Sequence, residues 1–557
     1  MRLRGLPSRL AAGALGVYAL YYASYGLLPG PVARGRVVVY LVNSKPLLGL
    51  PQLDLIVLAG LLAYAASRRR GGPALLGLLL AFAGYTIYTL TMRPWALALY
   101  SPAAALGLAA YRGRGLGWVA SSTALAASLV EALGLAGGLS YFALGRWAGP
   151  AWALVVRERL LWAALTWVLA PLAVIVGLAA LAAILLGRPG IHESLRRLLL
   201  GGRAPPGRVG RLGSPGGECG WCPWSVVASA GLAAFLVALP HLPTVNPGGA
   251  WVSVDTRYYM GFLSLARSQG LRAGLEAYSG MARPAYLALL YLAAGLVDPR
   301  ILVDVIHPIA ALTLLAAASY VAVSRLAGPR AGALAALLAA SGRTAATFII
   351  GGFQANSIAL PLALLMLAAP PGSLALPVLA ALVALVHPWT YVMYAAAYPL
   401  AHRRSLKEPG RLAALLALLV GALLLAEAAQ RLAAPGASAV GPVASSLEPL
   451  ALKPEPAPLN VFHALTLWTW GSQDQAPLLL AGLLAPPGPL WAPLAASSPL
   501  LLALPAMLAH RILLNAPIEQ LAAIQAGESR DPAIKAFLLL AALAGSTIAL
   551  AGIASFG

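Results

Sequence analysis

The sequence predicts an all-α protein, a polytopic bundle of transmembrane helices, from three observations. Of its 557 residues, 60% are hydrophobic and only 10% are charged, whereas roughly a quarter of the residues are charged in a soluble protein. The mean hydropathy is +0.81. Apolar runs of about 18 residues or more, the length that crosses a bilayer as a helix, recur from one end of the chain to the other.

The net charge of +21 is carried by short stretches between these apolar runs. Such a distribution is typical of the positive-inside rule and of contact with anionic lipid head groups. It argues against nucleic acid as a partner. The basic N-terminus (MRLRGLPSRL) and the apolar run after it resemble a signal peptide, but no convincing cleavage site follows. We therefore expect this run to be the first membrane span.

Basic clusters such as Arg68-Arg69-Arg70 set the orientation of the first half of the chain. They predict an N-terminal transmembrane module over 1–187 with about six spans, followed by a basic, Gly/Pro-rich cytoplasmic linker over 188–223. The expected spans lie near 10–29, 50–67, 73–91, 94–111, 116–138 and 159–187.

The second module is predicted over 224–557, with long outer loops at 242–300 and 432–473. Within the first loop, 257–280 has the helical spacing of an interfacial helix, and 285–296 is apolar but too short to span. The other spans are expected near 224–241, 301–323, 331–350, 356–370, 410–431, 475–486, 488–507, 512–527 and 534–556.

The apolar run 374–401 is too long for one span and has His387-Pro388-Trp389 at its middle. Both flanks of the run carry features of the inner side. We therefore predict two short helices that meet in a turn at His387 on the outer face.

Ionisable residues gather at the predicted outer face. Such residues are costly near membrane depth and usually face a cavity or a partner. The alternative interpretation is that polar residues simply belong at helix ends. The group comprises five of the seven histidines (His241, His307, His387, His463 and His510) together with Asp255, Asp304, Arg257, Arg283 and Arg511.

Asp255 is the leading candidate for a catalytic residue. It is the only acidic residue in the polar first half of the loop, and Arg257 and Tyr258 follow it. A carboxylate there could act as a general base or bind a metal, or it could cap the helix that follows. Arg283 and Arg511 could hold a phosphate with their planar guanidinium groups, or extend along the interface.

The two cysteines, Cys219 and Cys222, lie in the predicted inner linker, where we expect no disulfide framework. A zinc site would need two more ligands, and only His192 is close in sequence on that side. We interpret the pair as incidental reduced thiols. The sequence has no P-loop, which argues against an ATP-driven pump.

Within the second module, roughly residues 224–527 resemble the GT-C superfamily of membrane glycosyltransferases, which includes oligosaccharyltransferase-, aminoarabinose-transferase- and mannosyltransferase-like enzymes. The family has an acidic residue in a long outer loop, amphipathic helices that end near a proline, a basic inner turn and a later outer turn. The corresponding stretches are 254–259 (VDTRYY), 279–286 (SGMARPAY), 324–330 (SRLAGPR), 342–344 (GRT) and 351–356 (GGFQAN). Residues 1–200 match no family in this way.

The resemblance implies a transferase that takes sugar from a polyprenyl-phosphate donor at the outer face of the cell membrane. Asp255 would be the base and Arg511 the family arginine that contacts the lipid phosphate. The other substrate or phosphate contacts would come from Arg257, Tyr258, Arg283, His387 and His510.

This sequence departs from the family at Gln354 and Asn356, where a second acidic motif is expected. Neutral amides bring no charge to a divalent cation. We therefore expect an inverting reaction that needs no metal, and we expect no metal site, with a divalent cation disfavoured as cofactor.

Two other classes of function remain open. A lipid or solute transporter, or flippase, needs discontinuous helices and a site at mid-membrane depth, and the paired helices around His387 would allow it. Against it stands the lack of charged residues at predicted span centres apart from Glu131 and Glu427. The third class is a non-catalytic membrane scaffold, which would suit the N-terminal module.

Overall fold

The computed structural model describes most of the second half of the chain and parts of the first. The described residues are 116–146, 172–186, 219–279, 283–403, 405–435, 476–486, 488–503, 506–529 and 531–554, with Arg9, Gly13, His192 and Ser438. The side chains of 116–120, 502–510, 528 and 553–554 are not among them. Four spans predicted before residue 112, most of the linker 188–223 and most of the outer loop 432–473 lie outside these residues.

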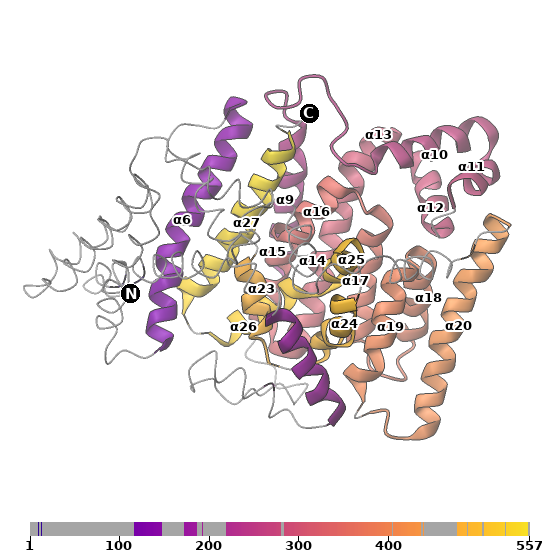
Figure 1. Ribbon diagram of the computed structural model, residues 1–557. Helices are drawn as coiled ribbons and strands as arrows, with labels where there is room; N and C mark the ends of the chain where they lie inside the picture. The colour runs from indigo at the N-terminus through magenta and orange to yellow at the C-terminus, as the bar shows by residue number, and fades with distance from the viewer. Residues whose placement is uncertain are drawn as a thin grey trace, which may run out of the picture. The chain divides into compact units, whose positions relative to one another are not determined.

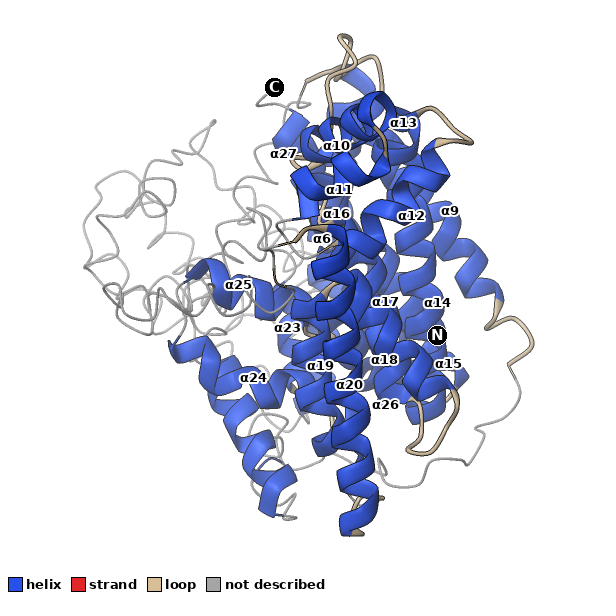
Figure 2. Ribbon diagram, turned by 90° about the vertical axis from the view of Figure 1, so that its right-hand side faces the viewer, coloured by secondary structure: helices blue, strands red, loops and turns tan. Residues whose placement is uncertain are grey.

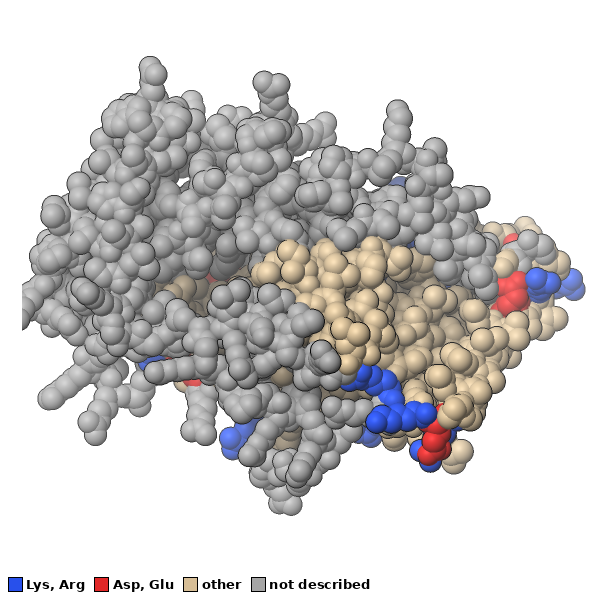
Figure 3. Space-filling model, turned by 60° about the horizontal axis from the view of Figure 1, so that its bottom comes forward, with Lys and Arg blue, Asp and Glu red and all other residues tan. Residues whose placement is uncertain are grey.

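Every regular element in the described part of the chain is a helix (Figure 2). The prediction of an all-helical fold is confirmed for the described residues, and six helical stretches are long and apolar enough to cross a membrane. They are Ser121–Leu144, Trp224–His241, Pro299–Ala327, Pro329–Gly351, Pro409–Ala433 and Pro532–Gly552. On the face shown in Figure 3, the described surface shows Lys, Arg, Asp and Glu only as a few small groups.

The chain divides into two compact units. Unit 1 comprises Met1–Val168, Ser472–Ala476 and Ser529–Ile548, and unit 2 comprises the remainder. The described part of unit 1 holds α6 (Leu116–Leu144) and most of α27 (Pro532–Ala554). These helices pack closely, because a Cβ built on Gly138 would lie 2.9 Å from Cγ2 of Thr547.

Unit 2 holds the other helices and the candidate site. The first of these run from α9 (Trp224–Ala238) and η4 (Leu239–His241) through α10 (Thr256–Gln269), α11 (Leu271–Tyr278), α12 (Pro284–Ala294), α13 (Pro299–Ile301) and η6 (Leu302–Ile306) to α14 (His307–Ala327). They are followed by α15 (Pro329–Ser341), α16 (Arg343–Gly351), α17 (Gln354–Ala368), α18 (Ala375–Val386), α19 (Pro388–His402) and α20 (Pro409–Ala433). The last are α23 (Ala476–Leu483), η9 (Pro489–Trp491), α24 (Ala492–Ala503), α25 (Ala506–Asn515) and α26 (Ile518–Glu528).

Small residues allow the central helices of unit 2 to approach one another. Ala316 on α14 and Ala336 and Ala340 on α15 are fully buried together. A Cβ built on Gly332 would lie 2.8 Å from the backbone oxygen of Tyr320. Close backbone approach of this kind is how helices pack within a membrane, where apolar bulk alone gives no driving force.

The predicted division of the long apolar run 374–401 into two helices at His387 is confirmed. Helix α18 ends at Val386 and α19 begins at Pro388, with His387 as the residue between them. The imidazole of His387 accepts a hydrogen bond from the backbone N–H of Thr390 and so caps α19.

Two other expected helices are interrupted. The predicted interfacial helix over 257–280 breaks at Gly270, whose φ of +92° favours glycine, so α10 and α11 are separate. The single span predicted near 512–527 is wrong, because α25 ends at Asn515 and α26 begins at Ile518. Pro517 lies between them and has no N–H to continue the helix.

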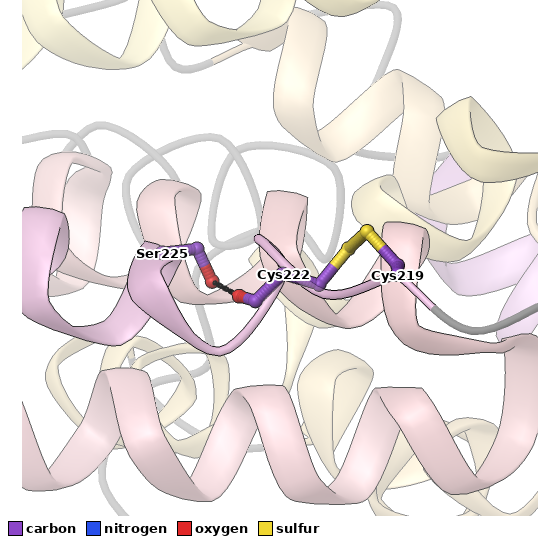
Figure 4. Close-up of a disulfide and its surroundings, with 3 residues drawn as sticks. All are labelled: Cys219, Cys222 and Ser225. Carbon is purple, nitrogen blue, oxygen red and sulfur yellow. Dashed lines mark hydrogen bonds between the residues drawn. A yellow bond between two sulfur atoms is a disulfide. The ribbon is translucent and has the colours of Figure 1, made fainter.

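The interpretation of Cys219 and Cys222 as reduced thiols is also wrong, since they form a disulfide at the start of α9 (Figure 4). The backbone N–H of Cys222 donates to the carbonyl of Cys219 at 3.0 Å. The tight turn brings the two Cα atoms to 5.4 Å, which is a usual separation for a disulfide.

Candidate functional site

Asp255 lies at the start of α10 in unit 2. Helix α10 lies close to α11 and α13 (Figure 1). It occupies the N-cap position, yet its side chain makes no capping hydrogen bond. The residues on either side are anchored. The N–H of Val254 donates to the carbonyl of Ile350 at 2.9 Å, and the hydroxyl of Thr256 donates to Asp304. The carboxylate is thus held in place without being used as a cap.

A strained turn between α16 and α17 packs against Asp255. Gly352 has a φ of +82°, and a Cβ there would lie 2.6 Å from the Cβ of Asp255. Phe353 has a φ of +27°, which makes it the only non-glycine residue with positive φ in the described part of the chain. Such a conformation is costly for a bulky side chain and persists where the surroundings impose it, often at functional sites. The backbone N–H of Phe353 donates to the Asp255 carboxylate.

Two arginines face the same carboxylate. Burial raises the pKa of Asp255 above its usual range, while Arg283, the N–H of Phe353 and Arg511 each lower it in part. Neither arginine is close enough to Asp255 to form an ion pair among the described residues. One negative and two positive side chains therefore converge here without neutralising one another directly.

Within the described part of the chain, Arg283 is anchored through one nitrogen. Its Nη1 donates to the hydroxyl of Tyr259 at 2.9 Å, and Tyr259 is fully buried on α10. The Nε atom of Arg283 is buried and has no hydrogen-bond partner among the described residues. A buried donor without a partner is costly, so this nitrogen is available to an anionic ligand.

Arg511 comes from α25 and is exposed. Its backbone carbonyl accepts a hydrogen bond from Nδ2 of Asn515 at 2.8 Å. Thr390 on α19 donates to Oδ1 of Asn515 at 2.9 Å, and Tyr394 donates to its carbonyl at 2.9 Å. The end of α25 that carries Arg511 is thus joined to α19, the helix that begins after His387.

A buried ion pair lies beneath the site. Arg343 and Glu519 are 1% and 2% exposed, with Nε and Oε1 at 3.7 Å. Arg343 also donates to the carbonyls of Leu513 and Leu514 at 2.7 and 3.2 Å. These carbonyls lie at the end of α25, where they have no partner within the helix. Glu519 accepts from the N–H of Thr344 at 3.0 Å and so caps α16.

This pair corrects two sequence-based interpretations. The stretch Gly342–Thr344, expected as an outer turn, is a buried junction between α15 and α16. The expectation that predicted span centres lack charges beyond Glu131 and Glu427 is wrong, because Arg343 and Glu519 lie within the spans predicted near 331–350 and 512–527. Both charged residues could therefore have been recognised within the predicted spans from the sequence.

The two amides in place of the expected acidic motif are engaged with neutral groups. Gln354 accepts from the hydroxyl of Tyr286 at 3.0 Å and donates to the carbonyl of Val303 at 3.1 Å. Asn356 lies 2.5 Å from the hydroxyl of Thr390. Both amides hold helices together rather than presenting charge.

Two of the remaining candidates, Arg257 and Tyr258, make other contacts. Arg257 is exposed and stacks over the ring of Trp251 at 5.6 Å. The hydroxyl of Tyr258 donates to the carbonyl of Tyr278, and burial raises the pKa of Tyr258 to about 12. The side chain of His510 lies outside the described residues.

His387 remains close to the two arginines. Its Nδ1 is 2.8 Å from the hydroxyl of Thr390 and accepts from the N–H of the same residue at 3.3 Å. In the neutral tautomer in which Nδ1 accepts, Nε2 carries the proton and could donate to a ligand.

Asp304, which the sequence placed in the outer-face group without a role in the site, supports Asp255. It is 4% exposed and lies in the π-helical turn η6, a geometry frequent at functional sites. Its Oδ1 accepts from Thr256, the residue after Asp255, while Oδ2 is buried and no described residue forms a hydrogen bond with it.

Comparisons with known proteins identified no relative of this chain. No family model matches the chain, and no curated protein or solved structure matches it significantly.

Proposed function

We propose that this protein is a membrane glycosyltransferase that moves a sugar from a polyprenyl-phosphate donor to an acceptor at the outer membrane face. One observation carries the proposal. The Asp255 carboxylate faces Arg283 and Arg511 without an ion pair to either, beside the strained turn at Gly352 and Phe353. In the proposed reaction, the carboxylate is the base and the two guanidinium groups bind the phosphate.

The chemistry follows from these groups. Asp255 takes the proton of an acceptor hydroxyl, and its raised pKa makes it a stronger base than an exposed aspartate. The acceptor oxygen attacks the anomeric carbon as the bond from that carbon to the phosphate oxygen breaks. Arg283 and Arg511 stabilise the charge that develops on the departing lipid phosphate. Attack opposite the leaving group inverts the anomeric centre.

The donor set supports a reaction that needs no divalent cation. Gln354 and Asn356 are bonded to neutral partners and bring no charge. The guanidinium groups of Arg283 and Arg511 supply the positive charge that a cation would otherwise bring to the phosphate.

The test uses the purified full-length chain with polyprenyl-phosphate-linked hexoses and a cell-envelope extract as the source of acceptor. Release of polyprenyl phosphate is measured by mass spectrometry. We expect the Asp255→Asn variant to lose at least 100-fold in turnover while it still binds polyprenyl phosphate. Arg272→Ala is the matched control, because that arginine on α11 is 86% exposed and forms an ion pair with Glu276, which also lies on α11. Full turnover by Asp255→Asn would rule out the role of Asp255.

A transporter is the second candidate, and the buried Arg343–Glu519 pair favours it, since charges within membrane helices often mark a transport path. Arg343, however, donates hydrogen bonds to backbone carbonyls of α25, and Glu519 accepts one from the backbone at the start of α16. Uptake or lipid-flipping assays in proteoliposomes distinguish the two functions. Flipping of the lipid that continues in Asp255→Asn without any sugar transfer would favour the transporter.

A further inference from the structure

The Cys219–Cys222 disulfide has no part in the function proposed above. It precedes α9, whereas the loop that carries Asp255 follows α9 and η4. A helix of this length rises about 22 Å, so the disulfide and Asp255 are reached from different ends of α9. The two cysteines are the only ones in the chain.

The two sulfur-bearing residues differ in their surroundings. Cys222 is fully buried, while Cys219 is half-buried. Between them, Gly220 is exposed and Trp221 is 62% exposed. No described residue lies within 4 Å of a Cβ built on Gly220. Within the described part of the chain, the turn is therefore open on the side of Cys219 and closed on the side of Cys222.

A purely structural role explains little here. The stabilisation that a disulfide provides grows with the length of the loop it closes, and two intervening residues are close to the minimum. The same turn is already closed by the hydrogen bond from the N–H of Cys222 to the carbonyl of Cys219. The chain after Cys222 is also fixed, because the hydroxyl of Ser225 donates to the Cys222 carbonyl at 2.6 Å (Figure 4).

We propose that Cys219 and Cys222 form a redox-active pair that exchanges between disulfide and dithiol with a small thiol. An incoming thiolate attacks the accessible sulfur of Cys219, the bond between the two sulfurs breaks, and Cys222 leaves as a thiolate. A second thiolate then attacks the mixed disulfide at the sulfur of the small thiol. The small thiols leave as their disulfide, Cys219 becomes the second thiolate, and two electrons have entered the protein.

The position of Cys222 favours it as the leaving group. It lies two residues before the first residue of α9, where the aligned peptide dipoles place partial positive charge. Cysteines at helix N-termini and in pairs spaced by two residues are those in which the thiolate is stabilised. Burial also protects the sulfur of Cys222 from direct attack by a thiolate. The incoming thiolate therefore attacks Cys219, and Cys222 is the group that leaves.

The experiment equilibrates the full-length protein in detergent with reduced and oxidised glutathione at varied ratios. The free thiols are then trapped with a maleimide and counted by intact mass. We expect a reversible transition between no label and two labels, at ratios within the range of cellular glutathione pools. The Cys222→Ser variant should form a mixed disulfide with glutathione at least tenfold faster than Cys219→Ser, because only Cys219 is accessible.

The double variant Cys219→Ser/Cys222→Ser controls for labelling elsewhere and should take up none. A disulfide that resists excess reduced glutathione until the protein is denatured would overturn the proposal, as would equal rates of glutathione uptake by the two single variants. A metal ion held by the two thiols in the purified protein would also overturn it. None of these measurements depends on glycosyl transfer. The redox proposal and the proposed function can therefore be disproved independently of each other.

Discussion

Arg343 and Glu519 form an ion pair that joins the end of one helix to the start of another. Through Leu513 and Leu514, Arg343 satisfies carbonyls at the end of α25, the helix of Arg511. Through Thr344, Glu519 caps α16, which leads into the strained turn beside Asp255. The pair therefore links the helix that carries Arg511 to the helix that ends at the turn beside Asp255.

Removing one member of this pair should destabilise the protein strongly. We expect Arg343→Met to lower the free energy of unfolding by about 3–5 kcal/mol, because Glu519 is left buried and unpaired. The double variant Arg343→Met/Glu519→Gln should lose less than the sum of the single changes. Denaturant titrations in mixed micelles measure the free energy of unfolding of the two single variants, Arg343→Met and Glu519→Gln, and of the double variant. Strict additivity would show that the two side chains do not interact.

Gly352 should tolerate no side chain. Gly352→Ala adds a Cβ that would lie 2.6 Å from the Cβ of Asp255, at a φ of +82°. Gly372→Ala is the matched control, because its φ is +87° but no described residue lies within 4 Å of the new Cβ. We expect about 1 kcal/mol of lost stability for Gly372→Ala. Gly352→Ala should lose more than this and should also lose turnover. Equal effects would mean that the turn does not pack on Asp255.

The pH dependence of turnover should report Asp255. Since its pKa lies above the ordinary value of 3.8, the base becomes protonated and activity falls at a pH above that value. Arg283 lowers this pKa, so Arg283→Gln should move the acid limb of kcat/KM to higher pH. An acid limb that moves to lower pH, or does not move, would contradict the placement of Arg283 beside Asp255.

Binding of the lipid phosphate should depend on both arginines. We expect Arg283→Ala and Arg511→Ala each to weaken polyprenyl-phosphate binding by roughly tenfold or more, since charge-assisted hydrogen bonds contribute about 1.5–3 kcal/mol. Arg283→Lys should restore only part of the affinity, because lysine has no counterpart to the buried Nε donor. Native mass spectrometry with Arg272→Ala as control measures the change. Unaltered binding in both alanine variants would exclude this site for the phosphate.

Much of the helical architecture could be predicted because it depends on local features. Length and hydropathy are enough to locate spans such as Pro299–Ala327. Proline and excess length are enough to divide the run at His387. The break at Pro517 was missed because the apolar pattern continues across it, although proline was the available signal.

The contacts within the site could be predicted only in part. Asp255, Arg283 and Arg511 were singled out as polar residues on one side of the membrane, and the structure places them within electrostatic range of each other. Their supports come from tertiary packing, which the sequence pattern does not contain. The conformation of Phe353 depends on α16 meeting α10, and the partner of Arg343 lies in a distant helix.

The bonds around Asn515 have a mechanical consequence. Its carbonyl, its Oδ1 and its Nδ2 are engaged by Tyr394, Thr390 and the backbone of Arg511. The junction at Pro517 is therefore braced and cannot act as a free pivot. A shift of Arg511 toward a bound anion would be transmitted to α19 and so to His387 at its start. The two residues would respond to ligand as one rigid body.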